Sequence, residues 1–323
     1  MNISDIRAAD ARLAGRKRVT PLLSSPFLDE IAERPVLVKA ECLQHTGSFK
    51  FRGAWSAISA LPEGTGGVLA FSSGNHAQGV AMAARMRGLP AVIVMPADAP
   101  RLKLENTAAL GAEVVTYDRE TEDRDEIGSC LADMRGLSLV KPFDNPDVIA
   151  GQGTCGLEIA YQAKEAGVTE ATVLTCCGGG GLTSGIALAL EADAPGMKVR
   201  PVEPEGFDDV CRSLKAGEIR SNPTMAGSIC DAIVTPRPGD LTFPIMHRLC
   251  GPGLAIPDED ARRAMALAFV RLKLVLEPGG AAALAAALFH GNDLNDGPVI
   301  CTASGGNVDP GVFRAALDRY PEG

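Results

Sequence analysis

One lysine in this sequence lies where a charged side chain is poorly suited. Lys50 lies between a small-residue turn, residues 46–48, and an apolar pattern at helical spacing that predicts a helix. We expect Ser48 to cap that helix, which places Lys50 in its first turn. The positive end of the helix dipole disfavours a cation there. A lysine in this position is better tolerated neutral or covalently bound, as a Schiff-base lysine is, although a solvated surface lysine is the commoner case.

Three polar or glycine-rich loops, each following a predicted strand, are suited to bind anions. Residues 178–181 are four consecutive glycines before a helix, and their backbone N–H groups are free to converge on a phosphate. Residues 72–79 offer hydroxyls, an amide and backbone donors, which suit a small anion such as a carboxylate. Residues 303–307 form the third loop. Each loop alone has a plainer explanation, a packed turn or a helix cap, but together they predict one composite site at the carboxyl ends of parallel strands.

Composition excludes several classes of protein. The chain has 323 residues, of which 46% are hydrophobic and 22% charged, and a net charge of −9. A nucleic-acid partner is therefore not expected. No apolar run approaches the length of a membrane span, and the N-terminus lacks the order of a secretory signal. Nine cysteines without a CxxC pair favour free thiols in a reducing cytoplasm.

Strands and helices alternate through most of the chain. Such alternation predicts parallel sheets with helical crossovers. We expect strands over 36–38, 68–71, 91–95, 113–117, 172–177, 198–202 and 299–301. We expect helices over 75–87, 100–110, 119–135, 148–166 with an interruption at 151–153, and 182–192. A turn-rich junction at 141–146 predicts a domain boundary.

Four motifs in a fixed order resemble those of a known family. They are Ser48-Phe49-Lys50-Phe51-Arg52-Gly53-Ala54, Ser72-Ser73-Gly74-Asn75-His76-Ala77-Gln78, the glycines 178–181 and Ser304-Gly305-Gly306-Asn307. The chain resembles the fold-type II pyridoxal-phosphate enzymes, in the branch of serine/threonine dehydratases and serine racemases, from about Thr20 to Asp309. The resemblance implies a two-domain α/β fold like that of the tryptophan synthase β subunit, each domain an open, mainly parallel sheet flanked by helices. Residues 1–62 and 146–323 would form the larger, cofactor-binding domain, residues 63–145 a smaller mobile one, and the protein would be a homodimer.

The resemblance also assigns the cofactor contacts. Lys50 would form the Schiff base with pyridoxal 5′-phosphate and later move the Cα proton. The phosphate would be held by Gly178, Gly179, Gly180 and Gly181. Asn75 would contact the ring oxygen, Phe49 would flank the ring, Ser304 would bond the ring nitrogen and Glu277 would lie near the cofactor.

Substrate contacts follow from the same resemblance. Ser72, Ser73, Asn75 and His76 would surround the substrate carboxylate, and Ser73 could act as an acid on the face opposite Lys50. The chain departs from the family at residues 226–228, where Ala-Gly-Ser replaces the common Ala-Asp-Gly. Ser228 is therefore a further candidate for the carboxylate, and the preferred side chain of the substrate is left open.

An acidic loop resembles the divalent-cation site of the racemase-like members. Glu203 and Asp209 would supply carboxylate oxygens and Phe207 a carbonyl, which suits Mg²⁺ or Ca²⁺. A solvated acidic loop capping a helix explains the same residues.

The resulting functional prediction is β-elimination of a β-hydroxy amino acid, of the L-threonine or L-serine type, to a 2-keto acid and ammonia. Two alternatives stay open within the family: a racemase of serine or hydroxyaspartate, and a hydroxyaspartate dehydratase. An alternative of another class is a non-catalytic protein that binds an anion or nucleotide through the same glycine loops. That alternative gives Lys50 no chemical task.

Overall fold

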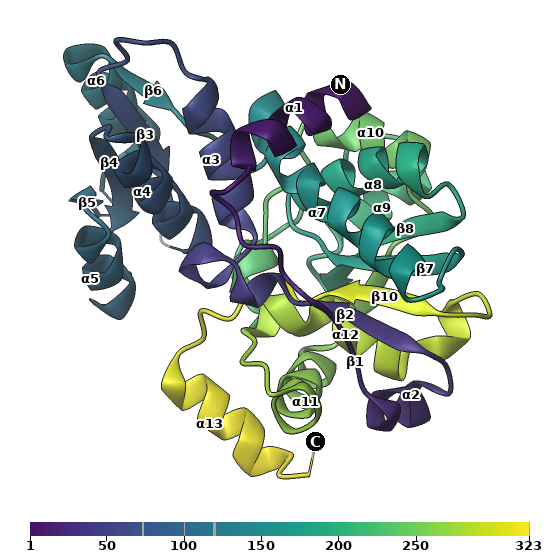
Figure 1. The fold of residues 1–323 in the computed structure, drawn as a ribbon. Coiled ribbons are helices and arrows are strands. Elements are labelled where there is room, and N and C mark those ends of the chain that lie inside the picture. The colour runs from purple at the N-terminus through teal and green to yellow at the C-terminus, as the bar shows by residue number, and fades with distance from the viewer. Residues whose placement is uncertain (73, 100, 119–120, 323) are drawn as a thin grey trace.

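Two α/β units, each with its own sheet, make up the chain (Figure 1). The computed structural model describes residues 1–72, 74–99, 101–118 and 121–322, except for the side chains of residues 102 and 125. The larger sheet has six strands in the spatial order β1 (Leu22–Ser24), β2 (Val36–Lys39), β10 (Val299–Thr302), β7 (Ala171–Cys176), β8 (Met197–Pro204) and β9 (Leu254–Ile256). The smaller sheet has four strands in the order β5 (Glu113–Tyr117), β4 (Ala91–Pro96), β3 (Gly67–Phe71) and β6 (Leu137–Leu139). All pairs are parallel except β1 with β2, which confirms the predicted fold class.

Helices cover both sheets, and α3 lies between the two units. The smaller unit carries α4 (Asn75–Arg87), α5 (Arg101–Ala109) and α6 (Arg124–Arg135). The larger unit carries α1 (Ile3–Leu13), α2 (Pro26–Ala32), α3 (Lys50–Ala60), α7 (Pro146–Glu165), α8 (Gly181–Asp193), α9 (Asp209–Ala216), α10 (Thr242–Leu249), α11 (Asp258–Leu267), α12 (Pro278–Phe289) and α13 (Pro310–Arg319). Helix α3 packs against α4 on one side and α7 on the other (Figure 1). We propose that the domains divide at 62/63 and 145/146, since the whole smaller sheet lies between these points.

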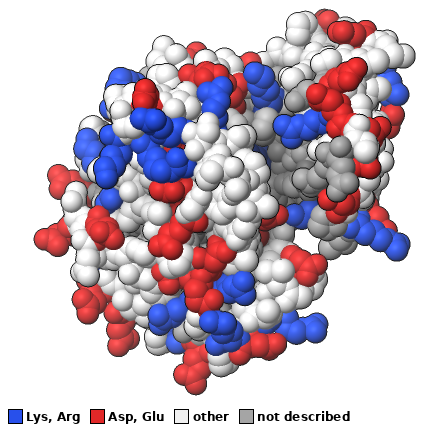
Figure 2. Space-filling model, turned by 180° about the vertical axis from the view of Figure 1, so that it is seen from behind, with Lys and Arg blue, Asp and Glu red and all other residues white. Residues whose placement is uncertain are grey.

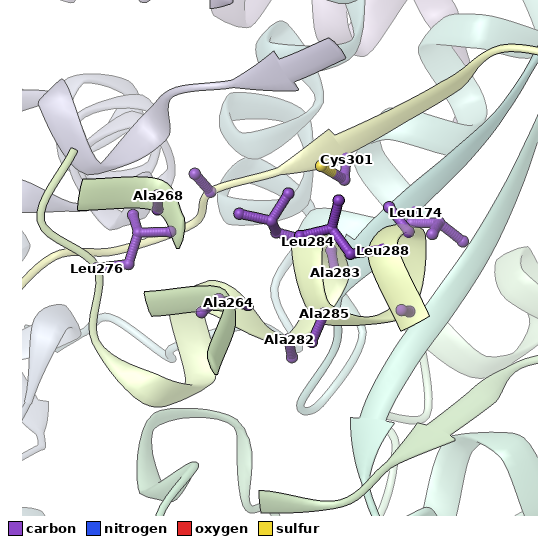
Figure 3. Packing of buried hydrophobic residues seen from close by; sticks show 14 of the residues in the cluster. Leu174, Ala264, Ala268, Leu276, Ala282, Ala283, Leu284, Ala285, Leu288 and Cys301 are labelled. Atoms are coloured by element: carbon purple, nitrogen blue, oxygen red, sulfur yellow. The ribbon is translucent and has the colours of Figure 1, made fainter. Parts of the chain in front are cut away.

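Helix α12 runs through the core of the larger unit. Its alanine-rich sequence is apolar on every side, which is the pattern of a helix that contacts no solvent. Residues 278–288 are buried, and the helix packs against β7, β8 and β10 (Figure 3). The small side chains allow this close approach, and the helix thereby fixes Glu277, its N-cap, at the carboxyl ends of the strands.

A buried ionic cluster anchors the other helix of interest, α3. Arg52 is inaccessible to solvent, and its guanidinium donates to Glu41 at 2.7 Å and to Glu158 at 2.8 Å. Burial alone would raise the pKa of Glu158, but the charges of Arg52 and Lys39 outweigh it and lower that pKa to about 2. Because Arg52 is two residues from Lys50, these paired charges hold the start of α3 in place.

Two local predictions are wrong. Helix α7 is continuous through residues 151–153, because its glycines pack against neighbouring helices: a Cβ on Gly151 would lie 2.4 Å from the carbonyl oxygen of Arg52. Ser48 does not cap α3. The helix begins after Phe49, and the buried Ser48 hydroxyl has no hydrogen-bond partner among the described residues.

The surface view and the helices add two observations. Figure 2 shows acidic and basic side chains interspersed on the face that it presents. In the described part of the chain, none of the helices combines the length and the hydropathy needed to span a bilayer.

The close contact of α3 and α7 gives a stability prediction. Alanine normally stabilises a helix by about 1 kcal/mol relative to glycine. Gly151→Ala should instead destabilise the protein by about 1–3 kcal/mol, because the new methyl group meets the Arg52 backbone. Urea unfolding measures the difference. The control is Gly311→Ala in α13, whose Cβ would meet only the exposed side chain of Asp309, at 3.0 Å; equal effects of the two substitutions would contradict the account.

Candidate active site

One cavity brings together the residues at the ends of three strands. Gly178, Gly179, Gly180 and Gly181 follow β7, Ser304 follows β10, and Asn75 begins the helix after β3. All of them line this cavity, together with Phe49, Lys50 and Glu277. Ser72 and His76 line an adjoining cavity that shares Lys50, Asn75 and Glu277. The composite site expected from the three loops therefore exists, although its loops come from both sheets.

Lys50 is the only lysine or arginine lining the inner cavity among the described residues. Its side chain is half-buried, and its amine is enclosed by protein and donates to the Pro142 carbonyl at 3.1 Å. Burial lowers the pKa of the amine to about 8, against an opposing effect of the Glu277 carboxylate. A minority of Lys50 amines, but far more than of ordinary lysines, is therefore neutral near physiological pH, and the neutral form is the nucleophilic and basic one.

The four glycines form a bare backbone cradle at the start of α8. Gly180 has φ of +90°, a conformation that favours glycine. A Cβ on Gly179 would lie 2.3 Å from the Phe143 ring, and one on Gly181 would lie 2.5 Å from the Gln152 Oε1. Side chains are excluded here, so the helix N-terminus presents backbone N–H groups to the cavity, which is an arrangement that binds phosphate.

A chain of side chains links the smaller unit to the larger one beside Lys50. Asn75 donates to the Glu277 Oε1 at 2.6 Å, and Asn307 donates to the Asn75 Oδ1 at 2.7 Å. Burial raises the pKa of Glu277 to about 7, although the bond from Asn75 acts in the other direction. The protonation of this carboxyl therefore changes within the physiological range, next to the reactive amine.

His76 is held as a neutral imidazole. Burial and then the positive charge of Lys50 lower its pKa to about 3. Its Nε2 lies 2.8 Å from the Val140 carbonyl, which can only accept, so the Nε2 carries the proton. The Nδ1 is buried without a partner among the described residues and is left as an acceptor.

Comparison with known proteins identifies the family. The family described as "Pyridoxal-phosphate dependent enzyme" matches residues 13–305. The chain belongs to this family. It is 43% identical over 315 residues to the L-threo-3-hydroxyaspartate ammonia-lyase of Pseudomonas sp, covering 97% of each chain. It is 38% identical to a serine racemase of Oryza sativa subsp. indica, covering 98% of this chain and 94% of that one. The solved structure of a threonine deaminase from T.th. superposes with a TM-score of 0.91 at 45% identity, covering 96% and 99% of the two chains.

The cavity of this pyridoxal-phosphate enzyme suits the family's cofactor. The cradle offers N–H groups to a phosphate, Lys50 offers a partly neutral amine to an aldehyde, and Ser304 offers a hydroxyl to the same cavity. The glycines also form a tightly packed turn, which is their plainer explanation, because neighbouring side chains fill the space where Cβ atoms would be. Both explanations hold at the same residues.

Four predicted residues lie elsewhere. The Ser228 hydroxyl donates to the Asp258 Oδ1 at 2.5 Å and faces a neighbouring groove rather than the cavity of Lys50. Glu203 near the end of β8, Phe207 in the loop that follows and Asp209 at the start of α9 lie outside the lining of that cavity. Ser73 lies outside the described residues, so its predicted role as an acid stays a prediction.

Sequence reasoning missed several lining residues. They are Phe143, Gln152, Thr183, Ala232, Ile233 and Thr235. Gln152 lies between two glycines in α7, and that unusual run of small residues was the only available signal. The others come from segments without a motif, and only the tertiary fold brings them to the cradle.

The lowered pKa of Lys50 gives a measurable prediction. In apoprotein, covalent attachment of pyridoxal phosphate to Lys50, trapped with borohydride and quantified by mass spectrometry, should rise with a midpoint near pH 8. An ordinary lysine would give a midpoint at about pH 10.4. Glu277→Gln should move the midpoint lower, because the carboxylate that favours the charged amine is removed. A wild-type midpoint near that of an ordinary lysine, or an upward shift in the variant, would contradict the account.

Proposed function

We propose that this enzyme removes water from a β-hydroxy amino acid and releases a 2-keto acid and ammonia. The observation that carries the proposal is the placement of a partly neutral lysine amine in the same cavity as a backbone phosphate cradle. The relatives named as ammonia-lyases support the same reaction class. A protein that only bound an anion would need the cradle but not an enclosed amine with a lowered pKa.

The protein's own groups each have a task in this reaction. Pyridoxal phosphate, when bound, supplies an aldehyde for the amino group and a ring that accepts the electron pair from Cα. The neutral Lys50 amine takes the Cα proton, and the Pro142 carbonyl orients the amine by accepting one of its N–H bonds. The glycine cradle and Asn75 fix position, and Ser304 faces the cavity with a neutral hydroxyl rather than a carboxylate. The Ser72 hydroxyl can donate to the substrate carboxylate, and the His76 Nδ1, which carries no proton, can accept from an N–H or O–H group of the substrate.

Two cationic residues favour an acidic substrate. Lys103 and Arg124 line the outer cavity together with Ser72 and His76, and with Lys50 they outnumber the two carboxyl residues among the described lining residues, Asp231 and Glu277. Lys103 already lies 3.6 Å from Asp231, which is a loose ion pair that a better-placed carboxylate can replace. We therefore propose a substrate of the 3-hydroxyaspartate type as the preferred one, which agrees with the name of the Pseudomonas relative. Racemisation of the same substrates is the second candidate; it requires an acid on the other face, the task predicted for Ser73.

Lys103 supplies a test of the substrate preference. Lys103→Met should raise KM for 3-hydroxyaspartate about tenfold, which is about 1.4 kcal/mol, and leave KM for serine unchanged. Release of 2-keto acid measures both, and chiral analysis of residual substrate measures racemisation. Lys141→Met, at an exposed lysine outside the cavity lining, is the control. Equal losses on the two substrates would contradict the preference, and activity retained by Lys50→Ala would contradict the reaction itself.

We further propose that Glu203, Phe207 and Asp209 bind Mg²⁺ or Ca²⁺. The Glu203 carboxylate accepts from the backbone N–H groups of Val210 and Cys211, and the Asp209 Oδ1 accepts from Asn222. The Asp209 Oδ2 is buried without a partner in the described part of the chain. Burial raises the pKa of both carboxyls, that of Asp209 to about 6. A hard cation would stabilise the ionised pair, with the Phe207 carbonyl and water as further ligands.

The raised pKa values fix the sign of a metal experiment. Without a cation, stability should fall as pH rises from about 4 to 6, since the unfolded carboxyl of Asp209 releases its proton first. Mg²⁺ at about 100 times its Kd should add about 2.7 kcal/mol to the free energy of unfolding at about pH 8 and little at about pH 4.5. Thermal unfolding with chelator and with Mg²⁺ measures this. The variant Asp209→Asn should lose the response; an unchanged response would place the cation elsewhere.

We also propose a cytoplasmic homodimer. The nine cysteines are all free thiols, which suits a reducing compartment. Several large apolar side chains of the larger unit are exposed, among them Phe27, Phe269 and Val275, and a second copy would cover apolar surface of this kind.

A further inference from the structure

Gln152 is a buried polar residue whose side chain the fold leaves largely unused. It lies in α7 with 1% of its surface exposed and lines the inner cavity together with Lys50 and the glycine cradle. Its carboxamide fits between two helices because each has a glycine there. A Cβ on Gly53 of α3 would lie 3.0 Å from the Nε2, and a Cβ on Gly181 of α8 would lie 2.5 Å from the Oε1.

The hydrogen bonds of this carboxamide are poor. The Nε2 donates to the Pro142 carbonyl at 3.5 Å, the long limit of such a bond, and Lys50 already donates to the same oxygen at 3.1 Å. The Oε1 is buried and has no partner in the described part of the chain. Buried side-chain amides are usually satisfied, so this exception needs a reason.

A second glutamine in α7 shows what a structural role looks like. The Gln162 Nε2 donates to the Thr20 carbonyl at 2.9 Å, and its Oε1 accepts from Lys39 at 2.9 Å. Both ends of that side chain are used within the protein. The contrast indicates that Gln152 has a partner that is not part of the chain.

We propose that Gln152 is a cofactor-binding residue that donates an N–H bond to the phosphoryl group of pyridoxal phosphate. Rotating the carboxamide by about 180° exchanges its oxygen and nitrogen, and the bond this breaks is only the long one to Pro142. The rotation turns the NH₂ group toward Gly181, at the N-terminus of α8 where the phosphate cradle lies. A bond from an amide to an anion is charge-assisted and stronger than the neutral bond it replaces.

The charge of the cavity makes this donor important. Lys50 is the only cationic side chain among the described residues that line the cradle cavity, and it is committed to the aldehyde end of the cofactor. The phosphate is therefore held by neutral donors, and each one counts. The rotation also leaves the Pro142 carbonyl to the Lys50 amine alone.

The test compares pyridoxal phosphate with pyridoxal, which lacks the phosphoryl group. Apoprotein is titrated with each compound, and the dissociation constant is taken from the absorbance of the bound form. Gln152→Met keeps the size of the side chain but removes the donor. It should raise the dissociation constant of pyridoxal phosphate about tenfold and leave that of pyridoxal unchanged. Gln152→Glu places a negative charge near the phosphate and should raise the dissociation constant of pyridoxal phosphate further. Gln162→Met, on the same helix, is the control and should change neither constant.

Each outcome decides the matter. Unchanged affinity of Gln152→Met for pyridoxal phosphate, or equal loss for both compounds, would overturn the inference and assign Gln152 a packing role. Circular dichroism and thermal unfolding show whether each variant folds. If Gln152→Met does not fold, the same comparison of the dissociation constants of pyridoxal phosphate and pyridoxal is made with Gln152→Glu. Because cofactor affinity is measured without substrate, the inference stands or falls separately from the proposed dehydration.

Discussion

The structure depends on keeping a primary amine inside a protein without its full charge. Lys50 begins α3, whose positive end disfavours a cation, and its amine is enclosed by protein. Both effects act against the ammonium form, and only Glu277 opposes them. The same cavity contains the positive end of α8 with four residues that lack side chains. A group that carries an aldehyde and a phosphate matches both features at once.

Helix packing sets the distance between these two features. Helices α3, α7 and α8 approach one another closely because Gly151 of α7 faces the α3 backbone and Gly185 of α8 faces the α7 backbone. Arg52 and its two carboxylate partners then prevent α3 from shifting along its axis. The reactive amine and the cradle therefore belong to one rigid assembly, while Asn75 reaches the site from the smaller unit. Motion of that unit would change the contacts of Asn75 and Glu277 without disturbing the anchor of Lys50.

Sequence reasoning succeeded where a residue's role follows from local pattern. The alternation of strands and helices predicted the fold class, and the glycine run before an apolar helix predicted the cradle. It failed where tertiary contacts decide. Glycines 151 and 153 predict a break in an isolated helix, but here they are required by the backbones that α7 touches. Ser48 has the right residue type for a cap, but Phe49 follows it as a turn residue and is the N-cap of α3. Phe143 and Thr235 lie in segments without a motif, so only the fold reveals that they surround the cradle.

The central claim is that one cofactor joins Lys50 to the glycine cradle, and a crystal structure of the protein grown with pyridoxal phosphate tests it most directly. We predict continuous electron density from the Lys50 Nζ to the cofactor, with the phosphate against the backbone of residues 178–181. Density for the cofactor on another lysine, or a phosphate bound away from those glycines, would contradict the account.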